Sequence, residues 1–342
     1  MGTVKTRTSV AKAKAGEKVV ALPQRRLAMI ALFVISAVGL VFEITLTRLF
    51  SLFFQYHFTF LAVSLAVLGL SLGAASAHYL KSGRLRSANT LTAVLIALSL
   101  ALTFASLIIA WMPEVDSIFP RALVALVPFF LIGLFDALVF ENFSGESGSL
   151  YAADLIGAAL GVAAVLVLLT LWSAFSMTLF LAALVGGLAV LLVYRSGIRS
   201  RQLLLAAVSF VLGAVLLVAN LAADVVDYDP LALTGVPRDK TMITILQDRS
   251  QLGSIIYTAW SPFARVDVVQ TGDHSSRYIF ADGGAGSFMQ AYDGDPVSLA
   301  ALGSSVEYLP FTSGSAARTL IIGAGGGIDI LRALHAGAEA IT

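Results

Sequence analysis

Residues 174–194 read AFSMTLFLAALVGGLAVLLVY, a run without a single charged side chain. A helix crosses the hydrocarbon core of a bilayer with about 20 apolar residues, so this stretch is long enough to span a membrane. Further stretches of similar length and composition occupy residues 27–47, 58–80, 90–112, 121–141, 152–172 and 202–222. None alternates apolar and polar residues with a period of two, so helices are predicted rather than barrel strands. The sequence therefore predicts a polytopic helical bundle of about seven spans over residues 27–222.

The overall composition agrees with a membrane protein and excludes several other classes. The chain is 58% hydrophobic and only 13% charged, whereas soluble proteins carry about 25% charged residues. Its net charge of +1 combines a basic tail over residues 1–26 with an acidic region over residues 223–342. The acidic region argues against nucleic acid as a partner. The absence of cysteine excludes disulfides and thiolate-bound zinc, and four scattered histidines predict no metal site.

The distribution of basic residues predicts an orientation. Lys and Arg concentrate on the cytoplasmic side of membrane proteins. Basic residues of this chain lie in the tail, in the loop after the second span and in the loop after the sixth: Lys81, Arg84, Arg86, Arg195, Arg199 and Arg201. These loops share one side, so we expect a multi-pass protein of the cell (inner) membrane with a cytoplasmic N-terminus. Seven spans then place the C-terminal region outside the cytoplasm.

Four charged residues in or at the ends of the predicted spans are membrane polar candidates: Glu43, Arg48, Asp136 and Asp154. A charge at the middle of a bilayer costs at least about 2.5–3.5 kcal/mol, so such residues normally face a cavity or one another. One interpretation is a polar path or substrate pocket between helices. The other places Glu43, Arg48, Glu141 and Asp154 at the interface with water and leaves only Asp136 within the membrane.

Two pairs of glycines in the predicted spans are spaced four residues apart. They are Gly69 with Gly73 and Gly157 with Gly161. Small residues at this spacing lie on one face of a helix and allow a neighbouring backbone to approach closely. We expect them to mark helix contacts rather than a function.

After the spans the chain becomes polar and is divided into three further regions. Aspartate, proline and glycine mark a linker over residues 223–240, and residues 241–295 are predicted to form a small antiparallel β-domain. Its expected strands cover 253–260, 265–270 and 277–281. A helix is expected over 297–309, with Asp295 as its cap.

The last region, 296–342, contains a pattern typical of nucleotide-like ligand binding. A short strand over 318–323 is followed by the glycines Gly323, Gly325 and Gly327 and by a helix over 328–336. Glycines let the backbone approach a ligand, and the first helical turn supplies free N–H donors. The dinucleotide fingerprint requires glycine where this chain has Ile328. The pattern is instead similar to the first loop of class I S-adenosylmethionine-dependent transferases.

Several motifs together resemble the spermidine synthase family. SPFARVDVV at 261–269, FADG at 280–283 and LIIGAGGG at 320–327 occur in the order found in that family. The spans contain EITLTRLFS at 43–51, YHF at 56–58 and YAADLIGAALG at 151–161. These resemble the N-terminal region of bacterial membrane-bound spermidine synthase-like proteins. The resemblance covers most of residues 27–342.

The resemblance implies a Rossmann-like transferase domain beginning in residues 296–342. Its glycine loop would surround S-adenosylmethionine or decarboxylated S-adenosylmethionine, and Asp282 and Gly283 would lie at the edge of the active-site cleft. Ala264 stands where the family usually has glutamine, and VEYLP at 306–310 replaces a Tyr-His pair. The group transferred to a small-molecule amine or other nucleophile is therefore left open between aminopropyl and methyl.

The family's catalytic acid and ribose-binding acid are expected beyond Thr342, because only fifteen residues follow Gly327. The chain as given is thus expected to be an N-terminal fragment that is inactive alone. An alternative function is a membrane transport or lipid-facing protein. In it, Asp136, Glu43 and Arg48 line a path, and the C-terminal region senses a nucleotide-like ligand.

Overall fold

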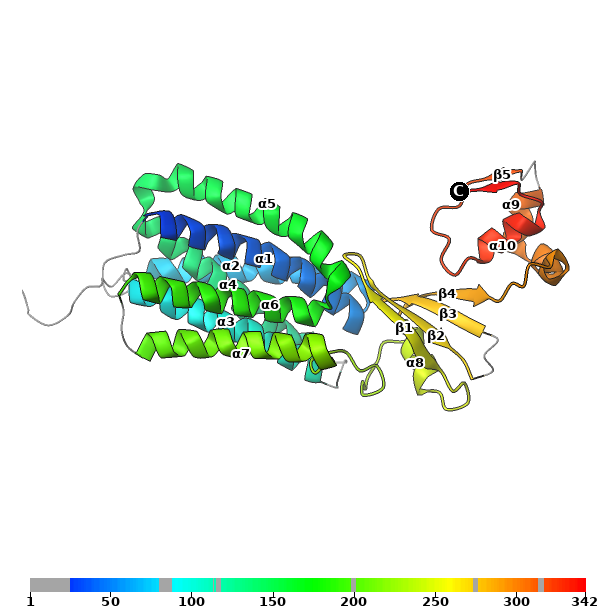
Figure 1. Cartoon of the computed structure of the whole chain (residues 1–342), viewed down its shortest axis with the longest axis horizontal. Helices are drawn as coiled ribbons and strands as arrows, with labels where there is room; N and C mark the ends of the chain where they lie inside the picture. The colour runs from blue at the N-terminus through cyan, green and yellow to red at the C-terminus, as the bar shows by residue number, and fades with distance from the viewer. Residues whose placement is uncertain are drawn as a thin grey trace, which may run out of the picture.

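The computed structural model describes residues 25–79, 88–112, 114, 118–197, 201–272, 276–312 and 317–342. Most of the predicted basic tail, and the loop residues Lys81, Arg84, Arg86 and Arg199, lie outside the described residues. Figure 1 shows three parts arranged along the long axis: a helical bundle, a small sheet at one end of it, and a C-terminal unit beyond the sheet.

Seven helices within the described residues are long and apolar enough to cross a membrane. They are α1 (Arg25–Phe53), α2 (Thr59–Tyr79), α3 (Ala88–Trp111), α4 (Ile118–Asn142), α5 (Ser147–Leu171), α6 (Ala174–Arg195) and α7 (Arg201–Ala223). Short 3-10 turns, η1 (Tyr56–Phe58) and η2 (Ser144–Glu146), precede α2 and α5. The prediction of seven apolar helices is confirmed, and α1 extends beyond its predicted end.

Helix α6, which contains the uncharged run 174–194, lies at the centre of the bundle. The most apolar window of α6 is 72% buried, compared with 22% for α5 and 17% for α7. Helix α6 packs against α3 and α7, while α1 packs against α5 and α2 against α4. The outer faces of α5 and α7 carry exposed Leu, Ile and Val side chains. Those faces are the surfaces that lipid tails can cover.

Glycines allow the helix pairs to touch backbone to backbone. A Cβ atom on Gly73 of α2 would lie 2.0 Å from the carbonyl oxygen of Phe130 on α4. A Cβ atom on Gly157 of α5 would lie 2.1 Å from the carbonyl oxygen of Phe33 on α1. Neither position can hold a larger residue without moving a backbone, so both predicted glycine pairs mark helix contacts.

The sheet end of the bundle is closed by a buried arginine. Arg121, near the start of α4, is fully buried, and its guanidinium lies 4.8 Å from the centre of the Phe53 ring. It donates hydrogen bonds to the carbonyl oxygens of Glu114, at 2.6 Å, and of Met112. Because these carbonyls follow the end of α3, Arg121 holds the α3–α4 connection against the end of α1.

The sheet contains four antiparallel strands in sequence order: β1 (Ser254–Trp260), β2 (Arg265–Gln270), β3 (Ser276–Ala281) and β4 (Ala285–Gln290). The three predicted strands are confirmed, and β4 is additional. Helix α8 (Thr241–Gln247), which lies where a β-domain was predicted to begin, contacts β4. Its side chains Met242 and Ile243 are buried.

The C-terminal unit contains η3 (Pro296–Ser304), η4 (Val306–Tyr308), α9 (Leu309–Thr312), β5 (Arg318–Thr319), α10 (Ile328–His335) and β6 (Ala340–Ile341). Asp295 caps η3 by accepting a hydrogen bond from the Val297 N–H at 2.9 Å, but this segment is a 3-10 helix that ends before 309. Strands β5 and β6 pair in parallel around α10. The described residues thus contain one short β–α–β unit, and a complete Rossmann-like domain is not shown.

Candidate functional site

The glycine loop joins β5 to α10 in a conformation that requires glycine. The φ angles of Gly323, Gly325 and Gly327 are 74°, 55° and 84°. This left-handed region costs other residues about 1–2 kcal/mol. Gly327 is the residue before the first turn of α10. The loop therefore leads from a strand into a helix as the sequence predicts, but β5 covers only Arg318–Thr319 of the strand predicted over 318–323.

One side of the loop is packed against strand β4. The Gly326 N–H donates to the Ser287 hydroxyl oxygen at 2.9 Å. A Cβ atom on Gly325 would lie 2.7 Å from that oxygen, and one on Gly326 would lie 2.1 Å from the Phe288 carbonyl oxygen. The other side is open among the residues that the structure describes, because a Cβ atom on Gly323 or Gly327 would meet none of them within 4 Å. A ligand can approach the backbone only from this open side.

Asp282 lies where β3 turns into β4, beside the bundle. One carboxylate oxygen accepts a hydrogen bond from the Ser51 hydroxyl of α1 at 2.5 Å, and the other accepts one from the Arg265 N–H at 2.8 Å. The carbonyl oxygen of Gly283, the next residue, accepts a bond from the Met242 N–H. The structure thus places Asp282 and Gly283 in the junction between bundle and sheet, and places the glycine loop against β4.

Lys240 completes this junction. Its ammonium group donates to the carbonyl oxygens of Ser51 and of Asp282, the latter at 2.8 Å, and the residue is buried. Burial lowers the pKa of Lys240, and the nearby Asp282 carboxylate opposes that shift. A charge buried at this junction is stabilised by these oxygens, so Ser51, Lys240 and Asp282 form one connected polar contact between α1 and the sheet.

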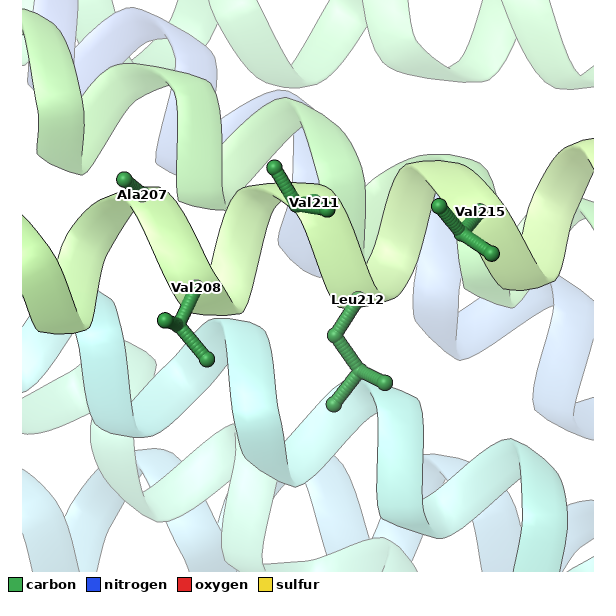
Figure 2. Close-up of a pocket in the computed structure, with 5 residues that line it drawn as sticks. All are labelled: Ala207, Val208, Val211, Leu212 and Val215. Atoms are coloured by element: carbon green, nitrogen blue, oxygen red, sulfur yellow. The ribbon is translucent and has the colours of Figure 1, made fainter.

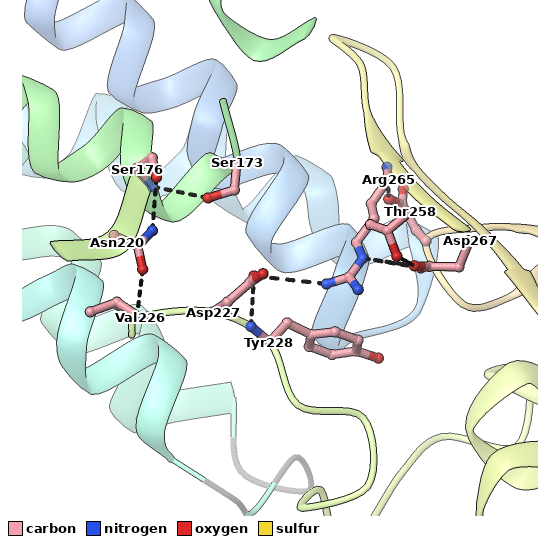
Figure 3. A network of polar contacts seen from close by, with 10 residues as sticks. Ser173, Ser176, Asn220, Val226, Asp227, Tyr228, Thr258, Arg265 and Asp267 are labelled. Carbon is pink, nitrogen blue, oxygen red and sulfur yellow. Dashed lines mark hydrogen bonds and ion pairs between the residues drawn. The ribbon is translucent and has the colours of Figure 1, made fainter. Parts of the chain in front are cut away.

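A second polar cluster surrounds Arg265 on β2 (Figure 3). The guanidinium donates to Asp267 at 3.1 Å and lies 4.9 Å from the centre of the Tyr228 ring. It also pairs with Asp227 at 3.8 Å, and Asp267 accepts a hydrogen bond from the Thr258 hydroxyl at 2.6 Å. Burial raises the pKa of Asp227 and of Tyr228, while Arg265 opposes both shifts. The cluster ties the linker to the buried face of the sheet.

The exit of α7 is fixed by an asparagine at the same end. The Asn220 side chain donates to the Ser176 hydroxyl at 2.7 Å and accepts a hydrogen bond from the Val226 N–H at 2.5 Å (Figure 3). Because Asn220 is fully buried, these bonds satisfy polar groups that water cannot reach. Together with Arg265, Asn220 positions the linker that was predicted only as a turn-rich connection.

The polar candidates in the helices have different surroundings: Asp136 and Asp154 lie among the helices, whereas Arg48 contacts the sheet. The Ser36 hydroxyl of α1 donates to the Asp154 carboxylate of α5 at 2.5 Å. One carboxylate oxygen of Asp136 on α4 is buried without a hydrogen-bond partner among the described residues. Arg48 instead reaches the sheet, where it donates to the Phe263 carbonyl oxygen, and Glu43 lies in the middle of α1.

Two surface grooves of the bundle are apolar. Figure 2 shows one of them along α7, lined by Ala207, Val208, Val211, Leu212 and Val215. Another lies between α1, α6 and α7, where Val34, Phe180 and Phe210 line it. Neither offers a polar side chain that could orient a substrate, so both suit lipid tails. Within the described part of the chain, no group of three His, Cys, Asp or Glu residues could hold a metal ion.

Two clusters at the junction between bundle and sheet were not predicted from the sequence. They are Lys240 with Ser51, and Arg265 with Tyr228. The signal for Arg265 was present in β2, where Arg265, Asp267 and Val269 alternate with less buried residues. Charged residues at two positions of a buried strand face predict a paired cluster.

Comparisons of the chain with protein-family models, with curated proteins and with solved structures gave no match.

Proposed function

We propose that this chain is part of a membrane-integral transferase of the spermidine synthase type. Helices α1–α7 span the cell membrane, and the glycine loop holds S-adenosylmethionine or its decarboxylated form. In the reaction, an amine or another nucleophile attacks a carbon bonded to the sulfonium. The carbon–sulfur bond breaks, its electron pair stays on sulfur, and a base accepts the proton of the nucleophile. Asp282 is not assigned this proton, because its carboxylate is buried in the junction between bundle and sheet, where Ser51 and Arg265 hold it.

The observation that carries the proposal is the open, left-handed glycine loop between a strand and a helix. The parallel pairing of β5 and β6 around α10 gives this loop the position that a nucleotide-binding turn has in α/β folds. Gly323 leaves its outer side free for a ligand. The motif order around the loop, quoted above, supports an S-adenosyl ligand over a dinucleotide.

The first test is ligand binding by a pair of matched variants. Gly323→Ala is expected to weaken binding of S-adenosylmethionine at least about tenfold, or ~1.4 kcal/mol, because its Cβ atom enters the open side of the loop and strains φ. Gly337→Ala is the control: Gly337 also has a positive φ, 81°, and also has nothing within 4 Å of an added Cβ atom. Isothermal titration of the two variants, with both forms of the ligand, measures the difference. Equal affinities of the two variants would overturn the proposal.

The second test is the orientation of the sheet. S-adenosyl ligands are made in the cytoplasm, so the transferase requires the exposed Gly235 to be cytoplasmic. A reporter fused at Gly235 that is active only outside the cytoplasm should therefore be silent, and a cytoplasmic reporter should be active. An active extracytoplasmic reporter and a silent cytoplasmic one would exclude the transferase. The positions of the basic loops predict this reverse result, because they place the C-terminal region outside the cytoplasm.

The alternative function, a transport or lipid-facing protein, is favoured by one specific observation. The unpartnered Asp136 oxygen and the Ser36–Asp154 pair place two carboxylates among the helices of the bundle. Buried polar groups in a membrane commonly line a path for an ion or a polar substrate. An extracytoplasmic reporter at Gly235 supports this alternative, because it separates the C-terminal unit from cytoplasmic S-adenosyl ligands.

A further inference from the structure

The turn between β1 and β2 lies beside the bundle rather than beyond its end. The turn contains Ser261, Phe263 and Ala264, and the Phe263 carbonyl oxygen accepts a hydrogen bond from Arg48. Arg48 precedes the end of α1 at Phe53 by five residues, which corresponds to roughly 7 Å along a helix. Strand β1 also contacts α5, and Figure 1 shows the turn next to the end of that helix.

The turn has a fixed shape. The Ser261 hydroxyl oxygen accepts hydrogen bonds from the N–H groups of Phe263, at 3.3 Å, and of Ala264, at 3.1 Å. The Ser261 N–H donates to the Ala264 carbonyl oxygen at 3.0 Å. At the base of the turn, the Arg265 guanidinium lies 5.7 Å from the centre of the Trp260 ring. A turn held in this way presents its outermost side chain in a defined position.

That outermost side chain is Phe263, whose surface is 80% exposed. An exposed aromatic ring at the level of the last turns of a membrane-crossing helix lies where bilayers meet water. Other exposed aromatic residues gather at the same end of the bundle: Tyr56, Trp111 and Phe119. Aromatic side chains are enriched at this depth in membrane proteins, because the interface solvates both their apolar and their polar parts.

We propose that the β1–β2 turn is a membrane-contact element, in which the Phe263 ring inserts into the interfacial region of the bilayer beside α1 and α5. The inference rests on the membrane-spanning part of the proposed function, and it holds for either orientation of the sheet. The occupant of this surface is lipid, because the turn is continuous with the exposed apolar faces of the spanning helices. The Arg48 hydrogen bond fixes the depth of the ring, so the turn anchors the sheet against the membrane surface.

Because the chain has no cysteine, single cysteines can carry a fluorophore at chosen positions. Phe263→Cys reports on the turn, and two exposed valines serve as references. Val208→Cys lies in the middle of α7 and Val297→Cys at the start of η3, with exposed fractions of 52% and 76%. Each labelled full chain is placed in vesicles of phosphatidylcholine and phosphatidylglycerol. Quenching is measured with iodide in water and with nitroxides placed high on the acyl chain or near its end.

The label at position 263 should be quenched most by the nitroxide high on the acyl chain, and iodide should quench it about threefold less than the label at 297. The label at 208 should respond most to the nitroxide near the chain end. If the label at 263 is quenched like the label at 297 while the label at 208 is quenched from the lipid, the turn does not touch the bilayer. The inference then fails, but the membrane-spanning proposal stands. If 208 is quenched by iodide, the membrane-spanning proposal fails as well. Shielding of 263 from every quencher would show a protein neighbour there and would also overturn the inference.

Discussion

Replacing Gly73 with alanine is expected to destabilise the bundle by about 3 kcal/mol or more, the upper range for overpacked cores. The added Cβ atom would lie 2.0 Å from the Phe130 carbonyl oxygen and 2.6 Å from the Leu134 nitrogen of α4. Both neighbours are backbone atoms, so no side-chain rotation can relieve the overlap. Helices α2 and α4 must move apart, and the packing along their whole contact is weakened. Thermal unfolding of the purified chain in micelles measures the loss.

The matched control for this prediction is Gly148→Ala in the first turn of α5. A Cβ atom on Gly148 would meet nothing within 4 Å, and alanine is the better helix former. Gly148→Ala should therefore unfold at the same temperature as the unaltered chain or slightly higher. Equal unfolding temperatures for the Gly73 and Gly148 variants would show that α2 and α4 do not approach as closely as the structure has them.

The glycine pairs show which features of helix packing in the bundle can be predicted from the sequence. Their spacing predicts a close contact, and Gly73 and Gly157 do meet the backbone of another helix. The sequence does not reveal which helix, because apolar side chains surround each span and almost every face could be buried. The pairing of α2 with α4 and of α1 with α5 depends on the fit of whole helix surfaces, which no local pattern encodes.

The elements that the sequence missed in the polar region have local reasons. Strand β4 reads AGSFMQ and follows three residues of which two are glycine, so its start looks like part of a turn. Helix α8 is only seven residues long, which is too short for an apolar period to emerge. Both are stabilised by contacts with each other and with the sheet rather than by intrinsic propensity.

In the candidate site, too, local features could be predicted from the sequence but contacts between distant residues could not. The glycine loop was predictable, because Gly323, Gly325 and Gly327 encode its left-handed backbone locally. The environment of Asp282 was not predictable, because its partner Ser51 lies 231 residues away in the sequence. A motif can name a residue type at a turn, but only the packed structure shows which groups its carboxylate meets.

Replacing Asp282 with alanine is expected to destabilise the junction by about 3 kcal/mol. The substitution leaves the Ser51 hydroxyl and the Arg265 N–H without their acceptor in a buried place, and each unpaired buried group costs about 1–3 kcal/mol. The backbone adds strain, because φ of Asp282 is 49°. Asparagine tolerates that φ and keeps one acceptor oxygen, and the Ser51 hydroxyl can turn to accept from its amide. Asp282→Asn should therefore lose less stability than Asp282→Ala, although the buried Lys240 ammonium loses its opposing charge in both variants.

Cleavage of the linker by a protease measures how often the junction between bundle and sheet opens. Arg238 is exposed two residues before the buried Lys240, so trypsin cleavage after Arg238 should report how often the junction separates. Cleavage should be fastest in Asp282→Ala, intermediate in Asp282→Asn and unchanged in Asp293→Ala, whose exposed carboxylate accepts a hydrogen bond from the Asp295 N–H two residues away at 3.0 Å. If all three variants are cleaved at one rate, Asp282 does not hold the sheet to α1. Its position would then be free for the edge-of-cleft role that the sequence motif predicts.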